Sequence, residues 1–200
     1  MSPKKDVSQE RKQQIMEAAQ NVFSRAGFHK ARMSDIAEQS GLSKGTLYWY
    51  FDSKEDIILN LLDRLFETEL QTLEKLIGDQ RSSEERLRVY ADHVIKDMLQ
   101  MMKWIPIAYE FITLAFRKKI IQKALHKYYQ KHMDILTPIL QQGMDRGELT
   151  AESAQDAAVA VGAILEGTLM LWVYDPEGIE IDRHIRSSLD LLIRGLRTEG

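Results

Sequence analysis

Apolar residues recur every three or four positions along most of this 200-residue chain, which is the period of an amphipathic α-helix. No segment shows the strict alternation that is typical of a strand, and only four prolines interrupt the pattern. We therefore expect an all-α fold. The pattern predicts nine helices, at about residues 8–26, 33–40, 44–50, 53–77, 83–103, 106–116, 118–146, 152–174 and 181–197.

Residues 33–54, MSDIAEQSGLSKGTLYWYFDSK, predict two short helices joined by a tight turn. Gly41 is expected to end the first helix, because a residue with positive φ is needed there and glycine has no Cβ to clash. Ser43 is expected to cap the second helix by accepting a backbone N–H. Leu47 is expected to face the core.

The second of these short helices carries three consecutive aromatic residues, which a helix of seven residues cannot bury completely. Lys44, Thr46, Tyr48, Trp49 and Tyr50 are left to point elsewhere. Hydroxyls and amines suit phosphates, and apolar edges suit thymine methyl groups. The pattern predicts a helix-turn-helix whose second helix reads the major groove. The alternative is that the aromatics simply pack, and we expect at least one of them to be half-buried.

The match to a known family extends beyond these helices. Gly27-Phe28, Ile36-Ala37, the run from Gly41 to Tyr48, and Tyr50-Phe51-x-Ser53-Lys54-Glu55 resemble the N-terminal signature of the TetR family of bacterial regulators. The resemblance covers about residues 10–60, and the rest agrees in architecture. It implies a helix-turn-helix domain over residues 1–54 and a helical ligand-binding and dimerisation domain over residues 55–200.

The resemblance also implies the DNA contacts. The expected DNA-binding residues are Arg32, Ser34, Ser43, Lys44, Gly45, Thr46, Tyr48, Trp49, Tyr50 and Lys54. Tyr50 and Lys54 would grip the phosphate backbone, and Lys54 lies at a helix N-terminus, which favours an anion. The family often has a capping threonine where this chain has Arg32. Arginine has no oxygen that could accept a hydrogen bond, so we expect Ser34 to take part of the capping role.

Charge is distributed unevenly along the chain, with the positive excess in the N-terminal part, as a DNA-binding protein needs. The net charge is −3, but residues 1–54 hold nine Lys/Arg against six Asp/Glu, whereas residues 55–200 hold eighteen against twenty-four. A basic N-terminal part on an acidic remainder would orient the former toward phosphates.

The last two predicted helices carry apolar residues on more than one face, which favours burial in the core and against a second copy. The resemblance implies that they form a four-helix dimer interface. The expected interface residues are Val161, Ile164, Leu165, Thr168, Trp172, Leu189, Leu192 and Leu196. The alternative is a monomer that keeps these helices in its own core.

The fifth to seventh predicted helices form the candidate sensor, because methionines and aromatics concentrate there and methionine adapts to apolar ligands. The expected ligand-binding residues are His93, Met98, Met101, Met102, Trp104, Tyr109, Glu110, Phe111, Phe116 and Glu166. A Met-rich core without a cavity is the alternative. Cationic ligands would favour several inward carboxylates, whereas the Met, Leu and Phe surface favours greasy neutral molecules or fatty acyl groups.

Other classes of protein find little support. The chain has no phosphate loop, nucleophile elbow, paired His–Glu metal motif or dinucleotide fingerprint, so we expect neither an enzyme nor a cofactor. His126 and His132 lie about 240° apart on a helix, and there is no cysteine, so no metal site is expected. No unbroken run of about 18 apolar residues and no secretory signal are evident, which indicates a cytoplasmic protein without a membrane span.

The sequence therefore predicts a ligand-gated repressor that binds a palindromic operator as a homodimer. Two copies of so small a recognition helix, about 34–36 Å apart, would multiply contacts and select palindromic sites. A DNA-binding regulator without a small-molecule ligand, or an activator, is the alternative.

Overall fold

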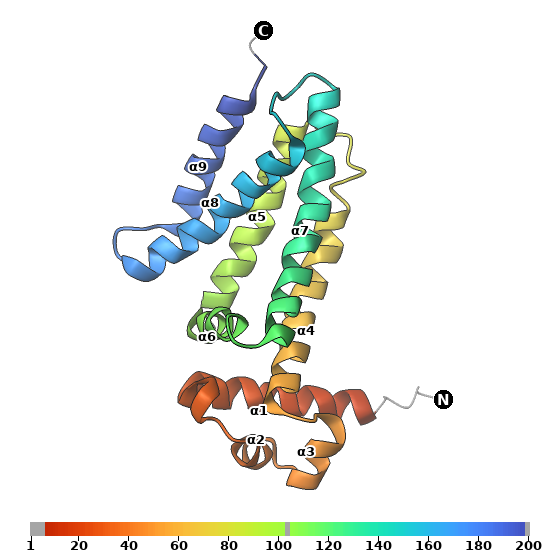
Figure 1. Cartoon of the computed structure of the whole chain (residues 1–200), viewed down its shortest axis with the longest axis vertical. Helices are drawn as coiled ribbons and strands as arrows, with labels where there is room; N and C mark the ends of the chain where they lie inside the picture. Colours follow the sequence, from red (N-terminus) through yellow and green to blue (C-terminus); the bar gives the residue numbers. More distant parts are fainter. Residues whose placement is uncertain (1–6, 103–104, 199–200) are drawn as a thin grey trace. The chain divides into compact units, whose positions relative to one another are not determined.

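The computed structural model describes residues 7–102 and 105–198, with all their side chains except those of residues 62, 64–69, 101, 105–108 and 111. Its helices are α1 (Val7–Lys30), α2 (Met33–Ser40), α3 (Lys44–Tyr50), α4 (Lys54–Glu74), α5 (Ser83–Met101), α6 (Ile105–Ala115), α7 (Lys119–Asp145), α8 (Ala154–Tyr174) and α9 (Ile181–Leu196) (Figure 1). Each predicted helix corresponds to one of these, so the all-α prediction is confirmed.

The chain packs as two compact units. The first, here called the head unit, is Met1–Phe66 with Met102–His126, and the second, the body unit, is Glu67–Met101 with Lys127–Gly200. The head unit therefore extends past the predicted boundary at residue 54. The reason is that Leu114 and Ile121 are buried in the same core as Ile57 and Ile58, which brings α6 and the start of α7 into this unit.

α1, α2 and α3 pack around the apolar core of the head unit. Ile15 and Phe23 of α1 and Ile36 of α2 are almost fully buried, and Leu47 of α3 packs with them. Gly27 has φ 73° and ψ 157°, so regular helix ends there as predicted, and one further turn runs to Lys30. Figure 1 shows α1, α2 and α3 clustered together.

A buried arginine organises one end of the body unit. Arg86 of α5 is fully buried, and its guanidinium donates to Gln142 Oε1 at 2.7 Å and Ser83 Oγ at 2.9 Å. It also lies 3.4 Å from the carbonyl oxygens of Leu76 and Ile77, just beyond the end of α4. Arg86 therefore joins α5 to Gln142 of α7 and to the backbone that follows α4.

Ion pairs fasten one side of α9 to α5. Arg88 pairs with Asp190, and Arg186 pairs with Asp92. Exposed pairs of this kind contribute little to stability. They do settle which side of α9 faces α5, and Leu191, which lies on another side, is 67% exposed.

α8 is apolar on two faces. Val161 and Leu165 are buried, whereas Val159 and Leu171 are exposed. Among the described residues α8 is a helix long and apolar enough, by length and composition alone, to cross a membrane, with a mean hydropathy of 1.7. Core helices of soluble proteins meet the same criterion. Glu166 interrupts the apolar residues of α8, which is why the sequence has no unbroken run of about 18 apolar residues there.

Candidate nucleic-acid interface

The turn between α2 and α3 has the geometry that its sequence predicts. Gly41 has φ 67° and ψ 20°, and the next residue, Leu42, donates its backbone N–H to Ala37 O at 3.1 Å. Ser43 Oγ accepts the N–H of Thr46 at 3.0 Å. Both the glycine and the serine roles are therefore confirmed, and together they fix the angle at which α3 leaves the turn.

α3 divides its side chains between the core and the surface. Leu47 is fully buried, while Tyr48 is 47% and Trp49 75% exposed. Tyr50 is the half-buried aromatic, packed against the head core and edge-on to Trp49 with ring centroids 4.7 Å apart. Lys44 and Gly45 are exposed beside them, and Thr46 is half-buried. The helix thus presents an amine, hydroxyls and two aromatic rings on one accessible surface.

An aspartate caps the N-terminus of α2. Arg32 is the N-cap residue, and its backbone N–H is accepted by Asp35 Oδ2 at 3.0 Å. Ser34 Oγ lies 3.3 Å from Asp35 Oδ1 instead of accepting a backbone N–H. The expectation that Ser34 shares the capping is therefore wrong. Because Asp35 does this work, the side chains of Arg32 and Ser34 stay exposed and free to meet phosphate.

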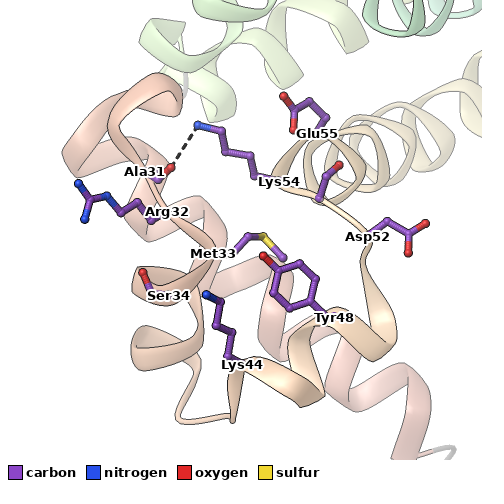
Figure 2. A pocket seen from close by; sticks show the side chains of 10 residues that line it. Ala31, Arg32, Met33, Ser34, Lys44, Tyr48, Asp52, Lys54 and Glu55 are labelled. Carbon is purple, nitrogen blue, oxygen red and sulfur yellow. Dashed lines mark hydrogen bonds between the residues drawn. The ribbon is translucent and has the colours of Figure 1, made fainter.

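A shallow groove of ≈ 420 Å³ runs between the start of α2 and α3, lined by Ala31, Arg32, Met33, Ser34, Lys44, Tyr48, Asp52, Ser53, Lys54 and Glu55. In Figure 2, Lys44 and Tyr48 rise from α3 toward Met33. The Lys44 ammonium lies 6.0 Å from the centre of the Tyr48 ring. This side of the groove offers one cation and a hydroxyl to a phosphate.

The acidic end of the groove is partly neutralised. Glu55 pairs with Lys118. Partial burial tends to raise the pKa of Glu55, but the hydrogen bond and charge of Lys118 outweigh it and hold this pKa below its ordinary value. Glu55 therefore contributes less repulsion to an approaching anion than its position suggests.

The structure gives Lys54 another role than the expected phosphate contact. Its ammonium donates to the carbonyl oxygens of Phe28 at 2.6 Å and of His29 and Ala31 at 3.1 Å each (Figure 2 draws the last of these). An ammonium has three donors, so all are committed. Lys54 caps the C-terminal carbonyls of α1, where a cation also suits the helix dipole.

Glu110 of α6 binds the same turn from its other end. Glu110 Oε2 accepts the backbone N–H of Phe28 at 2.5 Å. A Cβ at position 27 would come within 2.8 Å of Glu110 Oε1, so a larger residue would displace this carboxylate, and the φ of 73° favours glycine in any case. Glu110, expected to contact ligand, instead fixes the turn that leads into α2.

The other expected ligand residues do not form one described cluster. Phe116 is 87% exposed. His93 donates Nδ1–H to Val89 O at 2.8 Å within its own helix. Glu166 lies on the exposed side of α8, where partial burial raises the pKa of its carboxyl. Met98, Met102 and Tyr109 are half-buried, Trp104 lies outside the described residues, and the side chains of Met101 and Phe111 are not described.

Sequence reasoning missed a polar cluster in the body unit. His132 of α7 was considered only as a metal ligand, yet it is buried, and its Nδ1 lies 2.5 Å from the Tyr90 hydroxyl of α5. The ring of Tyr128 packs edge-on against it at 4.4 Å. The signal available in the sequence was one histidine directly before the apolar positions 133, 135 and 136 of α7.

The expected dimer residues separate into two groups. Val161, Leu165, Thr168 and Leu189 are buried within the chain, so the prediction that they form the interface is wrong for these four. Ile164, Trp172, Leu192 and Leu196 are half-buried. Amphipathic spacing marks a buried face without telling whether the chain itself or a partner covers it, which explains the error.

Comparison with known proteins adds independent findings. The chain matches the family model of bacterial regulatory proteins of the tetR family over residues 15–61 and that of the BetI-type transcriptional repressor C-terminal region over residues 80–196. It is 30% identical to an uncharacterized HTH-type transcriptional regulator, YfiR of Bacillus subtilis, over 74% of this chain and 73% of YfiR.

Solved structures with the same fold hold chemically different ligands. FadR of Bacillus subtilis, in complex with stearoyl-CoA, has a TM-score of 0.75 at 23% identity and covers 92% of this chain and 99% of its own. A transcriptional regulator of Saccharomonospora viridis, in complex with choline, has a TM-score of 0.79 at 19% identity and covers 96% and 100%.

Proposed function

Because the chain belongs to the TetR family of bacterial transcriptional regulators, we propose that it binds a palindromic operator as a homodimer in the cytoplasm and is released by a small, largely hydrophobic ligand. The observation that carries the proposal is the surface of α3. Leu47 holds this helix on the core while Lys44, Tyr48 and Trp49 remain exposed. This is the division that a recognition helix requires.

DNA contacts fall into two kinds. Arg32, Ser34 and Lys44 border the groove and supply phosphate contacts, which position the head without reading sequence. Thr46, Tyr48 and Trp49 reach base edges, where methyl and ring contacts discriminate thymine.

The test is an operator selected from a random DNA library with the purified protein, followed by affinity measurement by fluorescence anisotropy. Tyr48→Ala should weaken binding about 10- to 100-fold with little change in stability, the range for loss of one specific contact. Tyr129→Ala is the matched control, since Tyr129 is an exposed tyrosine of the body unit at 42% exposure against 47% for Tyr48. Equal affinities for both variants would refute the docking of α3.

The exposed apolar side of the last two helices is the proposed dimer interface. Ala163, Gly167 and Leu171 of α8 and Leu191 and Gly195 of α9 are exposed, and their small members allow close approach of two backbones. These residues replace the four buried ones predicted from the sequence. An apolar surface of this kind is what a soluble chain covers by association.

Sedimentation velocity tests this interface. Leu191→Glu should yield a monomer, because a desolvated carboxylate at the interface would lack a partner. Leu99→Glu, an exposed leucine of α5 at 48% exposure, should remain dimeric. A dimeric Leu191→Glu protein would exclude this surface.

Release by ligand requires that ligand and operator prefer different states of the protein, with a coupling free energy of about 1–3 kcal/mol. Any compound that raises the melting temperature by binding should therefore change operator affinity. A compound that binds and leaves operator affinity unchanged would favour the alternative of a regulator without a small-molecule ligand. Repression or activation depends on operator position and is decided by a promoter–reporter assay.

A further inference from the structure

His132 lies in the body unit between two tyrosines. It is 8% exposed, its ring centroid is 5.9 Å from that of Tyr90 and 4.4 Å from that of Tyr128, and both contacts are edge-on. Tyr90 Oη and His132 Nδ1 are 2.5 Å apart. One nitrogen of the imidazole is thus held by α5, and the ring orientation is fixed by aromatic packing.

The protonation state follows from these neighbours. A phenol is a better proton donor than a neutral imidazole N–H, so Tyr90 donates to Nδ1 and the ring proton lies on Nε2. Burial lowers the pKa of His132 to about 4, so the ring is neutral near pH 7. The second nitrogen is therefore an N–H donor.

This donor has no hydrogen-bond partner among the described residues although it is buried. A buried donor without an acceptor destabilises the fold, whereas a phenylalanine would fill the same space without that cost. Its tautomer is set by a second residue, Tyr90. Such an arrangement is explained if an acceptor arrives from outside the chain.

We propose that His132 Nε2–H is the polar contact of the ligand site in the body unit and donates to an oxygen of the ligand. The proposal rests on the proposed function and names the chemical class of its ligand. That class is an uncharged or anionic molecule with an apolar body and an accepting oxygen, such as a carbonyl or carboxylate. Quaternary ammonium ions have no lone pair to accept the hydrogen bond and would meet the positive end of the N–H dipole.

The fold alone does not decide between these classes, because a neighbour with the same fold holds stearoyl-CoA and another holds choline. The side chains around the site decide. The contacts described for His132 are the hydroxyl and ring of Tyr90 and the ring of Tyr128, so no carboxylate among the described contacts would attract a cation to it.

The experiment uses the full-length protein with ¹⁵N-labelled histidine, and NMR detects the side-chain nitrogens. Four probes are added: benzophenone and diphenylmethane, which differ by a carbonyl oxygen, and decanoate and decyltrimethylammonium, which differ in charge. We expect benzophenone and decanoate to shift the Nε2–H signal of His132 downfield, and the other two to leave it unchanged. His132→Phe assigns the signal by removing it.

Affinities measured by calorimetry complete the test. His132→Phe should weaken benzophenone binding about tenfold and leave diphenylmethane within about twofold, since one hydrogen bond is lost. Should that variant fail to fold, Tyr90→Phe is the second variant. It removes the hydroxyl that holds the ring proton of His132 on Nε2, so it should weaken benzophenone binding as well.

The proposal is overturned if the Nε2–H signal ignores bound benzophenone and decanoate, if diphenylmethane shifts it equally, or if none of the four probes binds. DNA binding is measured separately. If the protein binds its operator but the His132 signal does not respond to the probes, the ligand contact is refuted and the proposed function stands. If the His132 signal responds but the protein binds no operator, the proposed function is refuted and the ligand contact stands.

Discussion

The head unit and the body unit use polar side chains in contrasting ways. In the head, Ser43, Lys54 and Glu110 each bond to backbone groups at a helix end. In the body, Arg86 and His132 are buried, and each keeps one nitrogen without a hydrogen-bond partner among the described residues. The described part of the head holds no such buried nitrogen or oxygen.

This contrast matches two tasks. Recognition of base edges requires a fixed helix, because small displacements forfeit short directional contacts, and satisfied caps provide that rigidity. A ligand sensor instead benefits from polar groups that only the ligand satisfies. If this contrast holds, the polar groups of the body should respond to truncation and acid as buried groups do, and the two lysines of the head should differ as their contacts imply.

The largest effect is expected in the body. Arg86→Ala should lower the free energy of unfolding by about 4 kcal/mol, because a cavity forms and the hydrogen bonds from the guanidinium to Gln142 and Ser83 are lost. Urea unfolding measures it. Arg88→Ala, next but one in α5, removes only exposed ion pairs and should cost less than about 1 kcal/mol. Similar losses in the two variants would contradict the role assigned to Arg86.

Acid should act on His132. Its pKa is lowered from 6.5 in the unfolded chain to about 4 in the folded one, so between these values the unfolded chain binds a proton that the folded chain does not. Stability is therefore full above about pH 6.5 and falls as the pH approaches 4, by about 3 kcal/mol from this group. The wild-type protein should lose this much more than His132→Phe between pH 7 and pH 4. Parallel pH profiles would show that His132 is not buried neutral.

The sequence was a good guide to the head because its determinants are local. Gly41 and Ser43 act on their immediate neighbours, so their roles follow from residue type and spacing. The roles of Lys54 and Glu110 do not, since their partners at Phe28 lie 26 and 82 residues away. Lys54 was predicted to contact phosphate and Glu110 to contact ligand, because nothing in their local sequence indicates the distant backbone groups that they bind.

The body was less predictable for the same physical reason. Helix limits followed from periodicity, but the choice between core and interface depends on which helix covers which face. Val161 is 1% exposed and Leu191 is 67% exposed, although both are apolar residues of adjacent helices. The role of His132 depends on its contact with Tyr90, which lies 42 residues away in the sequence.

Lys54 and Lys44 offer a matched comparison within the head. Lys54→Ala should destabilise the protein by about 2 kcal/mol, since three charge-assisted hydrogen bonds to carbonyls are lost. Thermal or urea unfolding measures this loss. Unfolding unchanged by Lys54→Ala would mean that the three carbonyls are satisfied without it.

The smallest effect on stability is expected for Lys44, whose exposed ammonium makes no described hydrogen bond. Lys44→Ala should leave unfolding unchanged but reduce the slope of log K against log salt for operator binding by about 1, because one phosphate contact releases about one counterion. Lys54→Ala should keep the wild-type slope, since its charge already faces carbonyls. If Lys54→Ala instead lowers the slope and Lys44→Ala does not, the phosphate contact belongs to Lys54, and its cap on α1 must open when DNA binds.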